Sequence, residues 1–206
     1  MLIIGIYGGT GSGKTTIVKE IMSKFNSSDI NVISQDSYYK DNSHISFKKR
    51  SLINFDHPSS VDFELLYNHL KKLKNGCVIN SPTYDYKLHK RKKNKIKFKP
   101  KKILIIEGIL IMFNQKLRSI FDIKIFVEAN NTVRKTRRLK RDILERGRTQ
   151  NQIENRYEKY IKPMHKKFIQ PTKKFADIVI ENQEDKNVDL LTIINKVKLH
   201  VEWARN

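Results

Sequence analysis

Residues 8–15 read Gly-Gly-Thr-Gly-Ser-Gly-Lys-Thr, which matches a phosphate-binding pattern: two glycines with four residues between them, followed by Lys and Ser or Thr. An apolar run at residues 2–7 predicts a strand before this loop, and residues 14–25 predict a helix after it. Glycines let the backbone approach phosphate oxygens closely, and the positive end of the following helix attracts them. A loop of this kind between a strand and a helix predicts an α/β fold that binds a nucleotide.

The loop also predicts which residues contact the nucleotide. We expect its backbone N–H groups to cradle the phosphates, Lys14 to reach the outer phosphates, and the Thr15 hydroxyl to hold Mg²⁺. The expected nucleotide-binding residues of this loop are Gly8, Gly9, Thr10, Gly11, Ser12, Gly13, Lys14, Thr15 and Thr16.

The rest of the chain alternates short apolar runs with longer amphipathic stretches. Further strands are predicted at residues 31–34, 103–106, 123–127 and 178–180. Helices are predicted at residues 61–74, 131–145, 151–168 and 188–202. We therefore expect an α/β fold of the P-loop NTPase type: a doubly wound parallel five-stranded sheet with a small β-hairpin excursion and an Arg-rich helical lid.

We expect a single domain over residues 1–206. Residues 77–99 predict a β-hairpin beside the substrate pocket, with its second strand at residues 96–98, and residues 137–157 predict the lid region. Residues 37–60 are polar and are expected to be irregular.

The chain has 42 Lys and Arg residues against 21 Asp and Glu residues, a formal net charge of +21. Such a charge can bind nucleic acid, or it can belong to a solvated surface around a site for polyanionic phosphates. The basic residues are spread along the whole sequence, and only residues 87–102 form a dense run. The pattern therefore favours the second interpretation over nucleic acid.

No membrane span is predicted, because the longest apolar stretch, residues 103–113, is broken by Glu107 and is too short to cross a bilayer. The single cysteine, Cys77, excludes an internal disulfide and fits a reducing compartment. We expect Cys77 to be a small buried apolar residue. These features predict a cytoplasmic protein.

Asp36 follows the predicted strand at residues 31–34. An alcohol that accepts a phosphoryl group must lose its proton, so a carboxylate placed beside it can serve as the general base. The alternative is that Asp36 is a turn or helix-cap residue.

Glu107 ends the apolar run that begins at Ile103, and Gly108 follows it. A Glu in such a run is costly unless a charge meets it, and acidic residues at buried strand ends of P-loop proteins usually help to hold Mg²⁺. We expect Glu107 to share the metal with Thr15, and Gly108 to allow a tight backbone turn.

Arginines are concentrated in one stretch of this Lys-rich chain, at Arg137, Arg138, Arg141, Arg146 and Arg148. Planar, permanently charged guanidinium groups suit a transferring phosphoryl group better than lysine does. The stretch predicts a closing lid, with an exposed basic helix as the alternative. Residues 54–57 and 82–91 pair aromatic with polar side chains, which suits stacking on a planar base and hydrogen bonding to a sugar.

Taken together, these segments resemble the uridine kinase (uridine–cytidine kinase) family over nearly the whole chain, from Gly5 to about Asp177. The segments that carry the resemblance are the loop 8–15, Ser34-Gln35-Asp36-Ser37-Tyr38-Tyr39, Asn54-Phe55-Asp56-His57-Pro58, Tyr84-Asp85-Tyr86 with His89 and Arg91, Glu107-Gly108-Ile109-Leu110, Arg138 to Asp142, Glu145-Arg146-Gly147-Arg148, and residues 171–177.

The resemblance implies transfer of the γ-phosphoryl group of ATP or GTP to the 5′-hydroxyl of uridine or cytidine, with Mg²⁺, in pyrimidine salvage by a homotetramer. The implied catalytic residues are Asp36 as general base, Lys14, Arg141 and Arg146. The implied substrate-binding residues are Asp36, Tyr39, Phe55, Asp56, Tyr84, Tyr86, His89, Arg138, Arg148 and Arg156. Thr15 and Glu107 are the implied metal residues.

Two departures from the family pattern stand out. Arg156 occupies a position where the family usually has a glutamine that contacts the nucleoside, and a guanidinium offers donors only. Residues 181–183 read Glu-Asn-Gln where the family usually has Pro-Arg-Gly near the nucleotide. Asp185 is a further candidate for nucleotide contact in this region.

Other functions remain open at this point. A related P-loop kinase of another small alcohol, phosphoribulokinase-like or pantothenate kinase-like, is the main alternative. A nucleic-acid-binding NTPase would use the positive charge but would leave the acceptor-site carboxylates idle. A nucleotide-binding scaffold without catalysis is disfavoured because Lys14, Thr15, Asp36 and Glu107 are all present.

Overall fold

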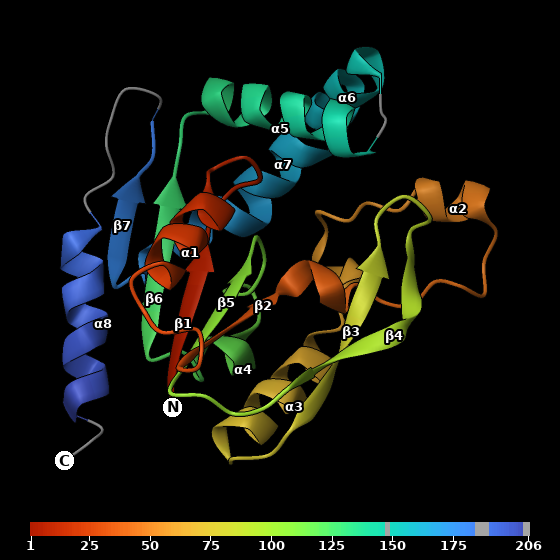
Figure 1. Ribbon diagram of the computed structural model, residues 1–206. Helices are drawn as coiled ribbons and strands as arrows, with labels where there is room; N and C mark the ends of the chain where they lie inside the picture. Colours follow the sequence, from red (N-terminus) through yellow and green to blue (C-terminus); the bar gives the residue numbers. More distant parts are fainter. Residues whose placement is uncertain (147–148, 184–189, 204–206) are drawn as a thin grey trace.

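The computed structural model describes residues 1–146, 149–183 and 190–203. Its centre is a parallel five-stranded sheet in the order β2-β5-β1-β6-β7 (Figure 1). The strands are β1 (Leu2–Tyr7), β2 (Ile30–Ser34), β5 (Ile103–Gly108), β6 (Ile123–Glu128) and β7 (Ile178–Glu181). The predicted doubly wound α/β fold is confirmed.

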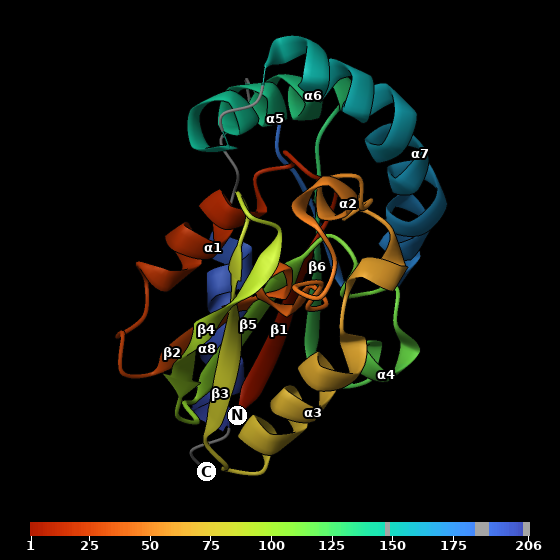
Figure 2. The same ribbon diagram turned by 90° about the vertical axis from the view of Figure 1, so that its right-hand side faces the viewer.

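The central strand β1 has its side chains buried in two cores, one on each face of the sheet. Leu2, Ile4 and Ile6 belong to the core under α1 (Lys14–Met22) and α8 (Leu191–Trp203). Ile3 and Tyr7 belong to the core under α3 (Phe63–Lys74) and α4 (Gln115–Arg118). Figure 2 shows these helix pairs on opposite sides of the sheet. Period-2 alternation within an entirely apolar strand explains both layers.

Three helices lie over the carboxyl ends of the strands (Figure 1). They are α5 (Asn131–Arg146), α6 (Gln150–Arg156) and α7 (Lys162–Met164). A capping box formed by Thr149 and Gln152 begins α6. The helix predicted at residues 151–168 is not a regular α-helix, because residues 157–161 and 165–169 are π-helical.

A separate antiparallel hairpin is formed by β3 (Ile79–Asp85) and β4 (Lys90–Phe98). β4 begins well before the predicted second strand at residues 96–98. Residues 92–97 are all exposed, so this strand lacks the alternation of apolar and polar residues that would mark it. The stretch at 37–60 contains one short helix, α2 (Phe47–Ser51), and a 3₁₀ turn at residues 58–60.

Cys77 is exposed, so the expectation that it is buried is wrong. It directly follows Gly76, which has a positive φ of 80° in the turn after α3. Within the described residues, each helix is too short or too polar to span a bilayer.

Candidate functional site

The carboxyl ends of β1, β2 and β5 open into a cavity of about 350 Å³, within the range of small-molecule sites. Parallel pairing sets Ser34 beside Glu107 and Tyr7 beside Gly108, so the segments that follow these three strands meet. The lining residues are Thr10, Gly11, Gly13, Lys14, Thr15, Thr16, Asp36, Tyr39, Phe55, Asp56, Tyr84, Tyr86, His89, Glu107, Gly108, Ile109, Arg137, Arg138, Arg141 and Arg156.

Two glycines of the phosphate-binding loop have a backbone conformation that would be strained for any other residue. Gly11 has φ 74° and Gly13 has φ 92°. A Cβ atom on Gly11 would lie 2.3 Å from the carbonyl oxygen of Arg134, and one on Gly13 would lie 2.0 Å from Nδ2 of Asn182. The loop is therefore packed tightly between α5 and the segment after β7.

Lys14 lies at the start of α1 and is 7% exposed. Its Nζ donates hydrogen bonds to the carbonyl oxygens of Gly8 and Gly9, at 3.1 and 2.9 Å. Burial lowers the pKa of Lys14 to about 8, although Glu107 and Asp36 oppose this shift. Phosphate oxygens beside the ammonium would favour its charged form.

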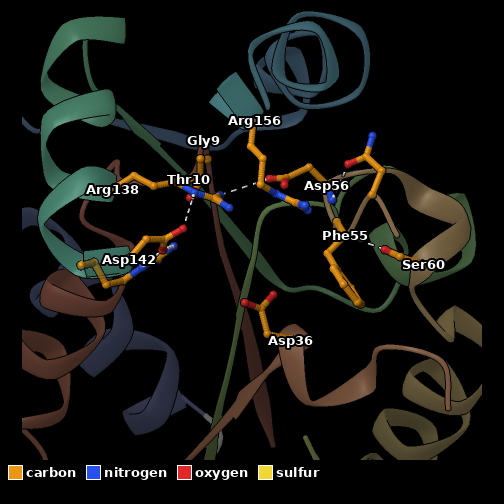
Figure 3. A network of polar contacts seen from close by, with 12 residues as sticks. Gly9, Thr10, Asp36, Phe55, Asp56, Ser60, Arg138, Asp142 and Arg156 are labelled. Atoms are coloured by element: carbon orange, nitrogen blue, oxygen red, sulfur yellow. Dashed lines mark hydrogen bonds and ion pairs between the residues drawn. The ribbon is translucent and has the colours of Figure 1, made fainter. Parts of the chain in front are cut away.

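Asp36 lies in the 3₁₀ turn at residues 35–38, directly after β2. The cap of this turn is Ser34, whose Oγ accepts a hydrogen bond from the Asp36 N–H at 3.3 Å. Asp36 is therefore a residue of this turn, as the alternative interpretation predicts, but it is not the cap. The Tyr39 hydroxyl donates to Asp36 Oδ1 at 3.1 Å. Figure 3 shows the Asp36 carboxylate pointing into the space below Arg138 and Arg156.

Glu107 lines the same cavity from the end of β5, and the Ser34 hydroxyl donates to its Oε1 at 2.6 Å. Burial raises the pKa of the Glu107 carboxyl, as does the nearby Asp36 carboxylate, whereas Lys14 lowers it. Thr15 lines the same cavity. Hard oxygen donors of this kind fit Mg²⁺, which usually binds through one or two carboxylates together with phosphate oxygens.

Gly108 does not have the role that the sequence predicts for it. It continues β5, and its φ is not positive. A Cβ atom there would lie 2.4 Å from the Cβ of Gln35. Gln35 is fully buried, and its Oε1 accepts a hydrogen bond from the Leu110 N–H at 2.7 Å. Close approach of Gln35, rather than a tight turn, explains this glycine.

Among the arginines of this stretch whose side chains the structure describes, Arg138 is the buried one, with 7% exposure. Its Nη1 donates to the Thr10 hydroxyl at 2.8 Å and lies 3.4 Å from Asp56 Oδ1. Its Nε lies 3.4 Å from Oδ2 of Asp142, one turn further along α5. Figure 3 shows this network linking α5, the phosphate-binding loop and Asp56. An exposed basic helix is therefore the wrong description of this face of α5.

Two neighbouring arginines flank Arg138. Arg141 Nη2 donates to Asp142 Oδ1 at 3.1 Å, and Arg137 Nη1 donates to the Asn182 carbonyl oxygen at 3.1 Å. Arg137 and Arg141 both line the cavity. Three arginines of α5 thus surround the space above the phosphate-binding loop.

The aromatic residues expected in the pocket gather on the other side of the cavity. The Tyr39 ring lies 5.0 Å from Phe55 and 5.3 Å from Tyr84, in edge-to-face geometry. The His89 ring stacks on Phe55 at 5.2 Å. His89 has φ 52°, a left-handed backbone that non-glycine residues rarely adopt. Tyr86 is more exposed and lies 5.6 Å from Tyr84.

Arg156 also lines this cavity, but its guanidinium is bonded to protein backbone. Nη1 donates to the Ser51 carbonyl oxygen at 3.1 Å, and Nη2 donates to the Ile53 carbonyl oxygen at 3.3 Å. Burial lowers the pKa of Arg156, and nearby Arg138 lowers it further.

The structure does not bring every expected residue to the cavity. Gly8, Gly9 and Ser12 support the loop without lining the cavity. The expected roles of Arg148 and Asp185 lie outside the described residues, and so does the side chain of Arg146.

Several residues that support the site are not among those predicted from the sequence. Arg134 is 4% exposed and packs against Gly9 and Gly11. Asp142 is 1% exposed. Arg134 and Asp142 lie one helical turn before and after Arg138, so the i, i+4 spacing of α5 was the available signal. Asn182 lies in the segment 181–183 that departs from the family pattern, but nothing in the sequence indicated that its Nδ2 donates to the Ser12 carbonyl oxygen, at 2.9 Å.

Comparison with known proteins agrees with this arrangement. The model of the Phosphoribulokinase / Uridine kinase family matches residues 3–189. The uridine kinase of Clostridium novyi (strain NT) is 48% identical over 197 residues, which cover 96% of this chain and 95% of the relative. That of Halalkalibacterium halodurans is 45% identical over 201 residues, which cover 98% of this chain and 95% of the relative.

Solved structures show the same fold at lower sequence identity. Phosphoribulokinase from Rhodobacter spheroides is 14% identical with a TM-score of 0.64, covering 87% of this chain and 69% of that chain. D-glycerate 3-kinase from Cryptococcus neoformans var. grubii is 18% identical with a TM-score of 0.65, covering 88% of this chain and 85% of that chain. The family match over most of the chain, together with relatives at 45–48% identity over nearly its full length, shows that this chain belongs to the phosphoribulokinase / uridine kinase family.

Proposed function

We propose that this protein is a nucleoside kinase that transfers the γ-phosphoryl group of ATP to the 5′-hydroxyl of uridine or cytidine, giving UMP or CMP for pyrimidine salvage. One observation carries the proposal: a single cavity joins a phosphate-binding loop, a carboxylate after β2 and an aromatic-lined acceptor side. Relatives named uridine kinase, 45–48% identical over nearly the whole chain, support this acceptor over another small alcohol.

Each group in the cavity has a chemical task in this reaction. Asp36 accepts the proton of the 5′-hydroxyl, and Lys14 stabilises charge on the transferring group. Asp56 holds the ribose hydroxyls, while Tyr84 and His89 contact the base. Thr15 and Glu107 hold Mg²⁺, which supplies charge neutralisation on the phosphates when it is bound.

In this proposal the chain is a single kinase domain, and residues 137–157 form its lid. The arginines of this region complete the site. Arg138 and Arg148 bind substrate or reacting phosphates in this proposal, and Arg141 and Arg146 stabilise the transferring group. GTP is an alternative donor. A homotetramer in the cytoplasm, where ATP and nucleosides are available, is the proposed assembly and compartment.

The experiment is to measure ADP release from Mg-ATP with uridine, cytidine, adenosine, pantothenate, an oligonucleotide or no acceptor. The proposal predicts turnover with uridine and cytidine only, and its loss in EDTA. Turnover with another alcohol alone would assign a different acceptor, and stimulation by the oligonucleotide would assign the +21 charge to nucleic acid. Repeating the assay with GTP compares the donors, and light scattering after size exclusion measures the assembly.

A further inference from the structure

The short helix α2 has little of its own to hold it in place. None of the residues Phe47–Ser51 is buried. Figure 1 shows α2 away from the five-stranded sheet. A segment without buried apolar side chains depends on a few polar and aromatic contacts for its position.

One set of contacts attaches α2 to the tip of the hairpin. Arg50 Nε donates to the Leu88 carbonyl oxygen at 3.1 Å. The Phe47 ring stacks on His89 at 6.2 Å, and His89 in turn stacks on Phe55. This side of α2 is therefore continuous with the aromatic wall of the cavity.

The other attachment is Arg156. Its two terminal nitrogens reach two carbonyl oxygens, of Ser51 and Ile53, which lie more than one hundred residues away in sequence. Backbone carbonyl oxygens only accept hydrogen bonds. A guanidinium has two terminal nitrogens in one plane and can reach two carbonyl oxygens at once, whereas a glutamine side chain has only one amide nitrogen to do so. The backbone that carries Arg156 is anchored in the protein, because Ile153 is 3% exposed and the adjoining Tyr157 is fully buried.

The two carbonyl groups that Arg156 contacts lie just before Phe55 and Asp56 in the sequence. Ile53 precedes Phe55 and Asp56 by two and three residues, and both of those side chains line the cavity. Figure 3 shows Arg156 of α6 lying beside Phe55 and Asp56. Movement of residues 51–53 would therefore displace the groups that face the acceptor.

We infer that Arg156 is a positioning residue: it ties the segment 47–53 to α6 and thereby sets the placement of Phe55 and Asp56, instead of reading the base of the nucleoside. The consequence for acceptor affinity rests on the proposed nucleoside kinase function. The attachment itself does not depend on that function. Two of its five N–H donors, one on each terminal nitrogen, are committed to Ser51 and Ile53.

The first test follows backbone hydrogen exchange in the absence of substrates, in the full chain and in Arg156→Met, Arg156→Lys and Arg156→Gln. Loss of two charge-assisted hydrogen bonds predicts exchange of residues 47–53 that is about tenfold or more faster in Arg156→Met and Arg156→Gln. Arg156→Lys restores part of the protection, because its ammonium keeps several donors. Lys159→Gln, a nearby exposed change, leaves exchange unaltered, and α3 exchanges equally in all variants. Unchanged exchange of residues 47–53 in Arg156→Met would overturn the inference.

The second test measures steady-state kinetics of the same variants. Arg156→Gln is predicted to raise KM for uridine about tenfold, with KM for ATP unchanged and kcat altered less. A lower KM for uridine in Arg156→Gln would mean that the side chain reads the base, and the inference would fall. If the native protein phosphorylates no nucleoside but Arg156→Met still exposes residues 47–53, the proposed function fails and the attachment stands.

Discussion

Individual residues of the phosphate-binding loop are constrained by backbone geometry as much as by chemistry. Gly11 and Gly13 have positive φ and lie against atoms of α5 and of the segment after β7. The motif predicts these glycines from sequence because the constraint is local. It does not predict their neighbours Arg134 and Asn182, which arrive from positions more than 100 residues away.

Gly11→Ala is predicted to be more damaging than Gly76→Ala, although the two glycines have similar φ values of 74° and 80°. A Cβ atom on Gly76 meets nothing within 4 Å, so its cost is backbone strain of about 1 kcal/mol. Alanine at Gly11 adds a clash with the Arg134 carbonyl, for a further loss of about 2 kcal/mol or more and weaker ATP binding. Denaturant unfolding and ATP titration of both variants measure this. Equal losses would show that the loop can relax around the methyl group.

The lowered pKa of Lys14 predicts that its side-chain amine takes up a proton when nucleotide binds, to an extent that depends on pH. Its pKa is lowered to about 8, so above pH 8 much of the free protein has a neutral amine there. Nucleotide phosphates favour the ammonium, so binding at pH 9 takes up a proton, whereas at pH 7 the group is already charged and takes up none. Calorimetry of ATP binding in buffers of different ionisation enthalpy measures the uptake. Uptake that is the same at both pH values, or unchanged in Lys14→Met, would contradict the assignment.

At the scale of elements, the helices and strands that bury apolar side chains could be predicted from the sequence, and the exposed ones could not. Strands buried on both faces, such as β1 and β5, were identified from their apolar runs. Most of β4 was missed because its exposed lysines show no alternation, and α2 was missed because it buries nothing. Site residues at or just after a strand end could be predicted, such as Glu107 at the end of β5 and Asp36 after β2, and both line the cavity. The partners of Arg156 could not be predicted, because backbone carbonyls leave no mark in a sequence.

Helix α5 depends on Asp142, which is 1% exposed and pairs with both Arg138 and Arg141. Asp142→Asn removes the charge that faces two guanidinium groups, so we predict a loss of about 3 kcal/mol in unfolding free energy. Thermal or denaturant unfolding measures it, with the exposed change Glu158→Gln as the control. Asp142→Asn as stable as the control would show that Asp56 alone compensates Arg138.

At the scale of the whole molecule, the protein has a net charge of +21, and its two proposed substrates differ in charge: Mg-ATP is anionic and the nucleoside is neutral. A strongly positive protein attracts anions over a distance that salt shortens. The association rate of Mg-ATP is therefore predicted to fall several-fold between about 0.05 and 0.5 M salt, while that of uridine stays nearly constant. Stopped-flow binding measures both rates. An equal response of the two substrates would mean that the charge plays no part in capturing ATP.

The sheet order β2-β5-β1 brings three separate sequence segments to one cavity, in which we propose that nucleosides are phosphorylated. The most direct test is to identify by mass the products formed from uridine and cytidine with Mg-ATP, using the native protein and Asp36→Asn. We predict UMP and CMP from the native protein, and at least about 100-fold slower formation by Asp36→Asn with ATP binding retained. No phosphorylated nucleoside from the native protein, or equal rates from the two proteins, would contradict it.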